Sequence, residues 1–301
     1  MYFRIFFNSK SGSQELDKLK ELFAKSSWLN TATITWTPIK DLHKNTLPTL
    51  LGQTKQPDAL LTAGGDGTSN LFIQHVIENN ITLPVGVLPL GTFNYFARYI
   101  NNNKKIEETV EHLELLSAQP YKILMANNNV VLNNISLGLY KNIIDTRERF
   151  KKITGRYRFI DILASLWVII FTRHSQIHLS IASDEHFYFN GRASVIFICA
   201  NPLQWQELDL PQARILDTNE IGIIIVPALR LVTLLKMLWG KLIRKVIDKN
   251  DYQVVIAKSF NINVHSFRYK KQFKAVIDGE VVNLSKTLIL KYSQNAVIFL
   301  K

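Results

Sequence analysis

The feature that most constrains this chain is the glycine-rich stretch Gly64–Thr68 (GGDGT), which joins an apolar run at 59–63 to a helical pattern at 68–78. Glycine lets a backbone approach a ligand closely and take positive φ. The free N–H groups at the start of a helix attract phosphate. An acidic residue, Asp66, is unfavourable beside a phosphate unless a metal ion lies between the two. The stretch therefore predicts a phosphate site with a metal ion, and a tight glycine turn capped by a hydroxyl is the alternative.

The surrounding pattern places this loop in an α/β domain. Strands and helices alternate through the first 120 residues, which predicts a parallel sheet covered on both faces. Ligands bind at the carboxyl ends of the strands in such sheets. The expected strands are 2–7, 32–37, 59–63 and 84–90, and the expected helices are 14–27, 68–78, 94–99 and 106–116.

After Pro120 the pattern changes to short strands separated by turns, which predicts a mostly antiparallel β-sandwich domain over 121–287. The expected strands are 121–126, 130–136, 176–183, 186–189, 193–200, 220–226, 254–260, 274–277 and 288–292. Helical stretches are expected at 139–150, 158–172 and 228–248.

The composition favours an anionic partner. The chain has 301 residues and a formal net charge of +12, which suits a nucleotide, a nucleic acid or an acidic lipid surface. Cys199 is the only cysteine, so no internal disulfide forms and a reducing cytoplasm is expected. No signal peptide is expected, and the apolar stretch 221–240 is interrupted by Pro227, Arg230 and Lys236, so no transmembrane helix is expected.

Four motifs together resemble the diacylglycerol kinase catalytic domain family, which includes bacterial lipid kinases and sphingosine kinases. Gly64–Thr68 resembles the family's GGDGT signature, and Asn8–Gly12 (NSKSG) resembles its N-P-x-S-G loop, with Ser9 in place of proline. Residues 89–98 (PLGTFNYFAR) resemble PLGTGNDFAR, and residues 278–280 match DGE. The family fold is an α/β nucleotide domain followed by a β-sandwich. The family's final strands often return to the first domain, so residues 288–301 are expected either to do the same or to stay in the second domain.

The resemblance implies that ATP is bound by the glycine-rich loops. The residues that it assigns to ATP are Asn8, Ser9, Lys10, Ser11, Gly12, Thr37, Gly64, Gly65, Asp66, Gly67, Thr68, Ser69, Asn70, Gly91 and Thr92.

The resemblance also implies the catalytic residues. It makes Glu280 the general base that takes the proton of a lipid hydroxyl as that hydroxyl attacks the γ-phosphate. Asp66 and Asp278 are the implied Mg²⁺ ligands. From the residues alone, Asp278-Gly279-Glu280 is a hairpin turn, because Asp-Gly is a strong hairpin signal.

Two departures from the family pattern affect these expectations. Phe93 and Tyr95 replace the family's glycine and aspartate, which removes a carboxylate near the implied metal. A structural Mg²⁺ site that related kinases hold in the second domain corresponds to Asp217–Ile221, where Asn219 replaces an aspartate.

The leading prediction is an ATP- and Mg²⁺-dependent lipid kinase of phospholipid metabolism that acts on a diacylglycerol-like or other lipid alcohol. The alternatives are a soluble kinase of a small hydroxyl compound such as NAD, and a nucleotide- or lipid-binding protein that has lost catalysis. The basic amphipathic stretch 228–249 favours peripheral contact with an anionic membrane at the inner face, and a helix that covers the sandwich is the alternative. No nucleic-acid motif is found, so no nucleic-acid partner is expected.

Overall fold

The computed structural model describes residues 1–8, 13–43, 47–52, 55–91, 93–138, 176–207, 220–227, 252–265 and 272–301. The chain forms two compact units. The first comprises Met1–Asn133, Asn201–Ala213 and Tyr292–Lys301, and the second comprises Asn134–Ala200 and Arg214–Lys291. The first unit thus extends beyond residue 120, where the change of sequence pattern placed the boundary, and it includes the end of the chain.

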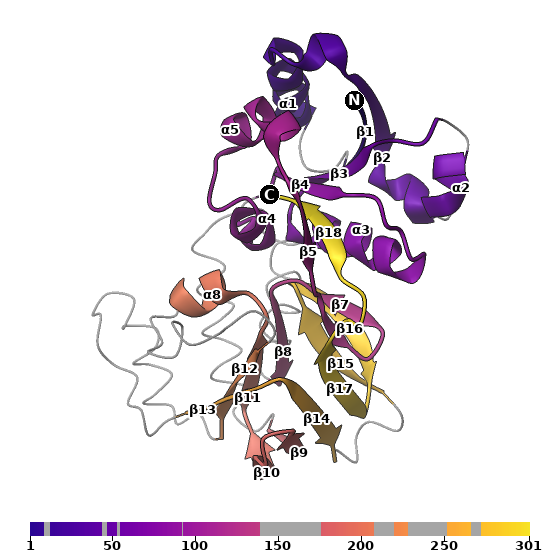
Figure 1. The fold of residues 1–301 in the computed structure, drawn as a ribbon. Coiled ribbons are helices and arrows are strands. Elements are labelled where there is room, and N and C mark those ends of the chain that lie inside the picture. The colour runs from indigo at the N-terminus through magenta and orange to yellow at the C-terminus, as the bar shows by residue number, and fades with distance from the viewer. Residues whose placement is uncertain are drawn as a thin grey trace, which may run out of the picture. The chain divides into compact units, whose positions relative to one another are not determined.

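The first unit is built on a sheet with the strand order β2-β1-β3-β4-β18-β5 (Figure 1). Neighbouring strands from β2 to β18 pair in parallel, and β5 pairs with β18 in the antiparallel sense. The predicted parallel α/β sheet is therefore confirmed. The strands are β1 (Tyr2–Phe7), β2 (Thr33–Pro38), β3 (Ala59–Gly64), β4 (Val85–Pro89), β5 (Ala118–Tyr121) and β18 (Val297–Leu300).

Helices cover both faces of this sheet because its strands present apolar side chains on both sides. In β1, Phe3 and Ile5 pack with α1 (Ser13–Lys25) and α5 (Ile106–Glu111). Phe6 packs with a second set of helices, which are α2 (Leu47–Gly52), α3 (Asp66–Glu78) and α4 (Tyr95–Ile100). The remaining elements of the unit are β6 (Leu124–Ala126), β7 (Asn129–Val131), α8 (Pro202–Glu207) and the short 3-10 helices Leu29–Thr31, Ile39–His43 and Leu113–Leu115.

The second unit contains two antiparallel sheets, which confirms the prediction of a mostly antiparallel β domain. One places β10, β9, β14 and β17 side by side, and the other has the order β13-β12-β11-β8-β15-β16. The strands are β8 (Asn134–Gly138), β9 (Ile177–Ser183), β10 (Tyr188–Ala193), β11 (Val195–Cys199), β12 (Ile221–Val226), β13 (Gln253–Ala257), β14 (Ser259–Val264), β15 (Gln272–Ile277), β16 (Glu280–Ser285) and β17 (Thr287–Tyr292).

Three single-strand predictions were wrong. The run 121–126 is divided between β5 and β6, the run 130–136 between β7 and β8, and the run 254–260 between β13 and β14. Polar residues stand at each break, namely Lys122, Asn133–Asn134 and Lys258–Ser259, but the apolar residues on both sides gave each run the pattern of one strand. The predicted helices at 139–150, 158–172 and 228–248 lie outside the described residues. No helix in the described ranges combines the length and the hydropathy that a bilayer-spanning segment requires.

The return of β18 places Lys301 among aromatic rings of the first unit. Its ammonium nitrogen lies 5.1 Å from the ring centre of Tyr121 and 5.7 Å from that of Tyr99. Burial lowers the pKa of Lys301 and raises the pKa of the Tyr121 hydroxyl. The cation–π contacts favour the charged lysine and help to hold the last strand against the domain.

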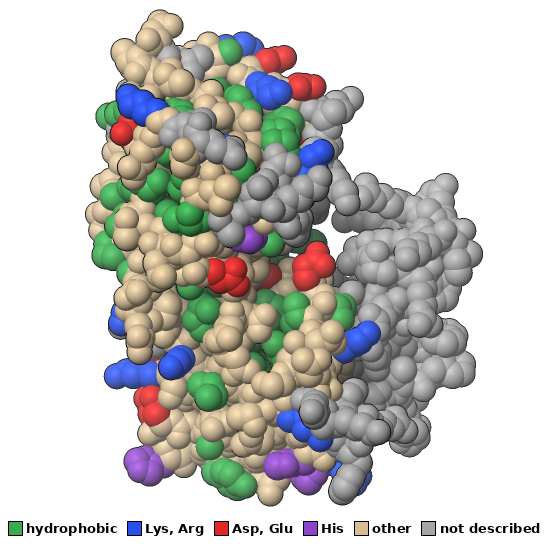
Figure 2. Space-filling model, turned by 90° about the vertical axis from the view of Figure 1, so that its right-hand side faces the viewer, with side chains coloured by type: hydrophobic (Ala, Val, Ile, Leu, Met, Phe, Trp, Pro, Cys, Tyr) green, Lys and Arg blue, Asp and Glu red, His purple; other side chains and the backbone are tan. Residues whose placement is uncertain are grey.

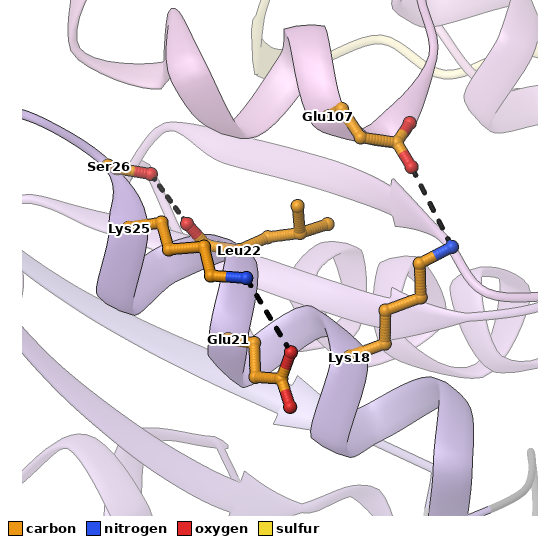
Figure 3. Close-up of polar contacts among 6 residues, drawn as sticks. All are labelled: Lys18, Glu21, Leu22, Lys25, Ser26 and Glu107. Atoms are coloured by element: carbon orange, nitrogen blue, oxygen red, sulfur yellow. Dashed lines mark hydrogen bonds and ion pairs between the residues drawn. The ribbon is translucent and has the colours of Figure 1, made fainter.

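Trp28 connects α1 to the layer formed by α5. Its ring meets Phe3 and Phe23 edge-on, with centroids 5.6 and 5.8 Å away, and its indole N–H donates to the Val110 carbonyl at 3.0 Å. The same two helices also share an exposed ion pair, with Lys18 Nζ 3.9 Å from Glu107 Oε1 (Figure 3).

Replacing Trp28 by Phe is expected to lower the free energy of unfolding by about 1–3 kcal/mol, because the Val110 carbonyl would lose its buried donor. Replacing Lys18 by Ala should change it by less than about 1 kcal/mol, because an exposed ion pair contributes little. Urea unfolding of the two variants measures both values. A Lys18→Ala loss as large as that of Trp28→Phe would contradict this order.

Candidate functional site

The candidate site lies at the carboxyl ends of β1 and β3. These strands are neighbours, but the chain leaves β1 for β2 on one side and returns to β3 on the other. Such a reversal of strand order is where open α/β sheets bind ligands. Asn8 follows β1, and its side-chain amide donates to the Thr68 hydroxyl, in the first turn of the helix α3 that follows β3, at 3.1 Å. The two loops are thus joined directly across the reversal.

The glycines of this region are explained by close contact between two backbones. A β-carbon on Gly91 would lie 2.5 Å from Gly65 Cα, and one on Gly64 would lie 2.5 Å from Thr68 Cβ. Leu90 N–H also donates to the Gly64 carbonyl at 3.0 Å. Gly65 has φ −84°, and a β-carbon there would lie 3.4 Å from Gly91 Cα, which is an ordinary contact, so the close approach requires glycine at 91 and not at 65.

Asn94 closes the loop after β4, although the sequence did not identify it as a functional residue. Its side-chain Oδ1 accepts from Gly91 N–H at 2.8 Å, and its side-chain Nδ2 donates back to the Gly91 backbone carbonyl at 2.6 Å. Asn94 has φ 52°, a conformation that asparagine tolerates better than most residues. The available signal was its position just before a helix in residues 89–98.

Asp66 stabilises the start of α4. Its Oδ2 accepts from Tyr95 N–H at 3.2 Å, and its Oδ1 accepts from Phe96 N–H at 3.0 Å and from the Asn133 amide at 3.1 Å. The first N–H groups of a helix have no partner within it, and hydrogen bonds to a carboxylate are stronger than neutral ones. Asp66 therefore joins the GGDGT loop to the loop and helix that follow β4.

The donor set at Asp66 fits a Mg²⁺ ion that arrives with a nucleotide. A carboxylate has about four acceptor positions, and the hydrogen bonds described above use only part of them. Mg²⁺ is commonly held by one or two carboxylates together with substrate phosphates and water. No group of three or more His, Cys, Asp or Glu residues within the described ranges forms a complete protein cage.

Phe93, in the loop after β4, and the half-buried Tyr95, the first residue of α4, form an aromatic pair. Their rings stack almost in parallel, with centroids 5.7 Å apart and an interplanar angle of 4°. The Arg98 guanidinium lies 5.9 Å from the Tyr95 ring centre, and Phe93 is 62% exposed. Where the family places glycine and aspartate, this chain thus presents a flat aromatic surface.

The turn Asp278-Gly279-Glu280 belongs to the second unit and joins β15 to β16. Asp278 and Gly279 have φ 49° and 90°, the positive values that a two-residue type I′ turn requires. Asp278 Oδ1 accepts from Asn134 N–H at 2.9 Å, and Asp278 N–H donates to the Asn134 carbonyl at 3.0 Å. Glu280 is exposed as the first residue of β16. The hairpin interpretation is confirmed, and it leaves the Glu280 carboxylate accessible.

The other predicted site residues are either packed within the first unit or lie outside the described ranges. Thr37 is buried and accepts from Arg4 Nε at 3.0 Å. Ser69 is buried in α3, and the Asn70 amide donates to the Val130 carbonyl at 2.9 Å. Gly67 is half-buried. The residues that lie outside the described structure are Ser9, Lys10, Ser11, Gly12, Thr92 and 217–219.

Replacing Gly91 by Ala is expected to destabilise the protein by about 1–3 kcal/mol, because its methyl group would press on the backbone of Gly65 and neither backbone can yield cheaply. Gly52→Ala is the matched control, since no atom lies within 4 Å of its β-carbon. The control should be neutral or stabilising by up to about 1 kcal/mol. Thermal unfolding compares the two, and equal behaviour would show that the loops do not depend on this contact.

Comparison with known proteins agrees with this geometry. Residues 2–126 match the model of the diacylglycerol kinase catalytic domain. A "putative lipid kinase" of Staphylococcus aureus (strain bovine RF122 / ET3-1) is 32% identical over 154 residues, which cover 49% of this chain and 47% of that protein. One of Staphylococcus haemolyticus (strain JCSC1435) is 27% identical over 146 residues, or 48% and 46%. The chain thus matches about half the length of these curated relatives.

Two solved structures share the fold over nearly the whole chain. A "putative diacylglycerol kinase" from Bacillus anthracis str. Sterne has a TM-score of 0.69 at 19% identity and covers 99% of this chain and 97% of its own. An NAD kinase from Archaeoglobus fulgidus, solved in complex with ATP, has a TM-score of 0.54 at 11% identity and covers 100% and 94%. Residues 2–126 are thus similar to the diacylglycerol kinase catalytic domain, as the motifs within them predicted.

Proposed function

We propose that this protein is an ATP-dependent lipid kinase that transfers the γ-phosphate to a hydroxyl group of a diacylglycerol-like or other lipid alcohol. The observation that carries the proposal is the junction of the Asn8, Gly64–Thr68 and Gly91 loops at the carboxyl ends of parallel strands. Kinase-family membership of residues 2–126 supports ATP as the phosphate donor. The names of the Staphylococcus relatives support a lipid acceptor.

In this proposal the chain supplies positioning and a proton acceptor. Backbone N–H groups of the glycine loops and the start of α3 bind the phosphates. Asp66 would hold Mg²⁺, which neutralises phosphate charge when it is bound with the nucleotide. Glu280, exposed at its turn, accepts the proton of the lipid hydroxyl as the new P–O bond forms and the bond to the leaving ADP oxygen breaks.

The Phe93–Tyr95 pair favours a second candidate, a nucleotide- or lipid-binding protein without catalysis. Tyr95 can donate a hydrogen bond but cannot neutralise a metal ion as the family's aspartate would. Incubation with labelled ATP and either a panel of lipid alcohols or NAD decides among these two candidates and the soluble kinase. Phosphate transfer to a lipid supports the kinase, transfer only to NAD supports the soluble kinase, and binding without transfer supports the second candidate.

The general-base role of Glu280 gives the sharpest test of catalysis. Glu280→Gln keeps the size of the side chain but cannot accept a proton, so kcat for lipid phosphorylation should fall by about 10²–10⁴-fold. Its ATP affinity should stay unchanged, because the glycine loops of the first unit are untouched. Lys274→Gln is the matched control, since Lys274 is another exposed residue of the same hairpin. If Glu280→Gln and the control variant have equal kcat values, Glu280 is not the general base.

We also propose that the protein binds anionic membranes peripherally, at the inner face of the cytoplasmic membrane. On the face shown in Figure 2, the Lys and Arg side chains of the described residues are scattered between apolar and uncharged surface. The concentrated charge that membrane attraction requires is instead found in the basic stretch 228–249, which lies outside the described residues.

Binding to vesicles that contain an acidic phospholipid is expected to fall steeply with added salt, because each basic residue near such a surface contributes ~1 kcal/mol that salt screens. Replacing Lys241, Arg244 and Lys245 together by Gln should weaken co-sedimentation strongly. Replacing Lys18, Lys20 and Lys25 by Gln removes the same charge from α1 and should weaken it little. Equal sedimentation with neutral and acidic vesicles at low salt would refute the membrane proposal.

A further inference from the structure

Two buried asparagines connect Asp66 to the points where the chain passes between the two units. Asn133 is the last residue of the first unit before the chain enters the second, and Asn201 is the residue at which the chain returns. They are 2% and 1% exposed. A buried amide costs free energy unless it is hydrogen-bonded, so their bonding partners are informative.

Hydrogen bonds link Asn201, Asn133 and Asp66 in a relay, and the groups at its two ends determine which atoms donate and which accept. Asn201 Oδ1 accepts from Leu203 N–H at 2.9 Å, as a cap at the start of α8. Its amide nitrogen must then donate, and it does so to Asn133 Oδ1 at 2.8 Å. Asn133 Nδ2 in turn donates to Asp66 Oδ1 at 3.1 Å. A backbone N–H can only donate and an ionised carboxylate can only accept, so the orientation of both amides is determined.

Asn134, the residue after Asn133, is hydrogen-bonded to Asp278, the other aspartate that the sequence predicts as a metal ligand. The two residues exchange two hydrogen bonds, and Asp278 is the first residue of the turn before Glu280. Asp66 and Asp278 are therefore each bonded to one of two consecutive residues of the chain.

We propose that Asn133 is a positioning residue for Asp66, and that Asn201 acts by orienting Asn133; this inference rests on the proposed kinase function. Asp66 holds α4 through two backbone N–H groups on one side and is held by Asn133 on the other. Without the Asn133 amide the carboxylate can turn, and both its presentation to a nucleotide-bound metal and its hold on α4 change. Loss of such an outer partner typically costs 10–100-fold in metal affinity or activity.

The test compares Asn133→Ala with Asn101→Ala. Asn101 is also buried in the first unit, and its amide donates to the Val87 carbonyl at 2.8 Å, away from Asp66. Both variants should lose similar stability in urea. Only Asn133→Ala should weaken Mg·ATP binding, by about 10–100-fold in calorimetry, and speed hydrogen exchange of the Tyr95 and Phe96 amides. If Asn133→Ala matches Asn101→Ala in both readouts, the positioning role is overturned.

Asn133→Asp supplies a second, nearly isosteric test. It keeps the size of the side chain but replaces the amide that donates to Asp66 by a second carboxyl group. Hydrogen exchange of the Tyr95 and Phe96 amides should therefore be faster than in wild type, as in Asn133→Ala, and exchange at the wild-type rate would contradict the proposal. Hydrogen exchange and Mg·ATP binding need no turnover, so they test the relay even if no lipid is phosphorylated.

Discussion

The close approach of two backbones, at Gly65 and Gly91, is the constraint on which the candidate site depends. A side chain at Gly91 would separate the loops that follow β3 and β4, because its β-carbon would lie 2.5 Å from Gly65 Cα. Because the loops touch, Asp66 can reach across and accept from the first N–H groups of α4. The glycines, the aspartate and the helix therefore form one structural unit, and a change in one of them alters the others.

This arrangement gives the aspartate of GGDGT two roles that are easily confused. It stabilises a helix start, and in the proposed mechanism it also presents a carboxylate to the metal that accompanies ATP. Loss of activity on replacing Asp66 would not separate the two, whereas Glu280→Gln leaves both roles of Asp66 intact. Glu280 thus provides a cleaner test of mechanism than Asp66 itself.

The replacement of the family's glycine and aspartate by Phe93 and Tyr95 changes the chemistry of the same loop. A carboxylate is exchanged for a stacked aromatic pair with a guanidinium beside it. The backbone contacts of Gly91 and Asn94 remain in place. The loop therefore carries less negative charge than the family pattern gives it, so more depends on Asp66 and on the residues that orient it.

The amino-acid sequence determined the alternating strands and helices of the first unit, the antiparallel strands of the second, the hairpin at Asp278-Gly279 and the similarity of residues 2–126 to the diacylglycerol kinase catalytic domain. These features depend on local periodicity, turn chemistry and short motifs, all of which are visible in a single sequence. Only the tertiary structure showed that the run 130–136 breaks at the passage between the units and that Gly91 packs on Gly65. It alone also showed that Asn94 bonds to Gly91, Asn133 to Asp66, and Asn201 to Asn133. Asn133 and Asn201 lie 68 positions apart, and an asparagine shows no sign in sequence of whether it is exposed or buried against a carboxylate, because its partners are decided by the packing of distant segments.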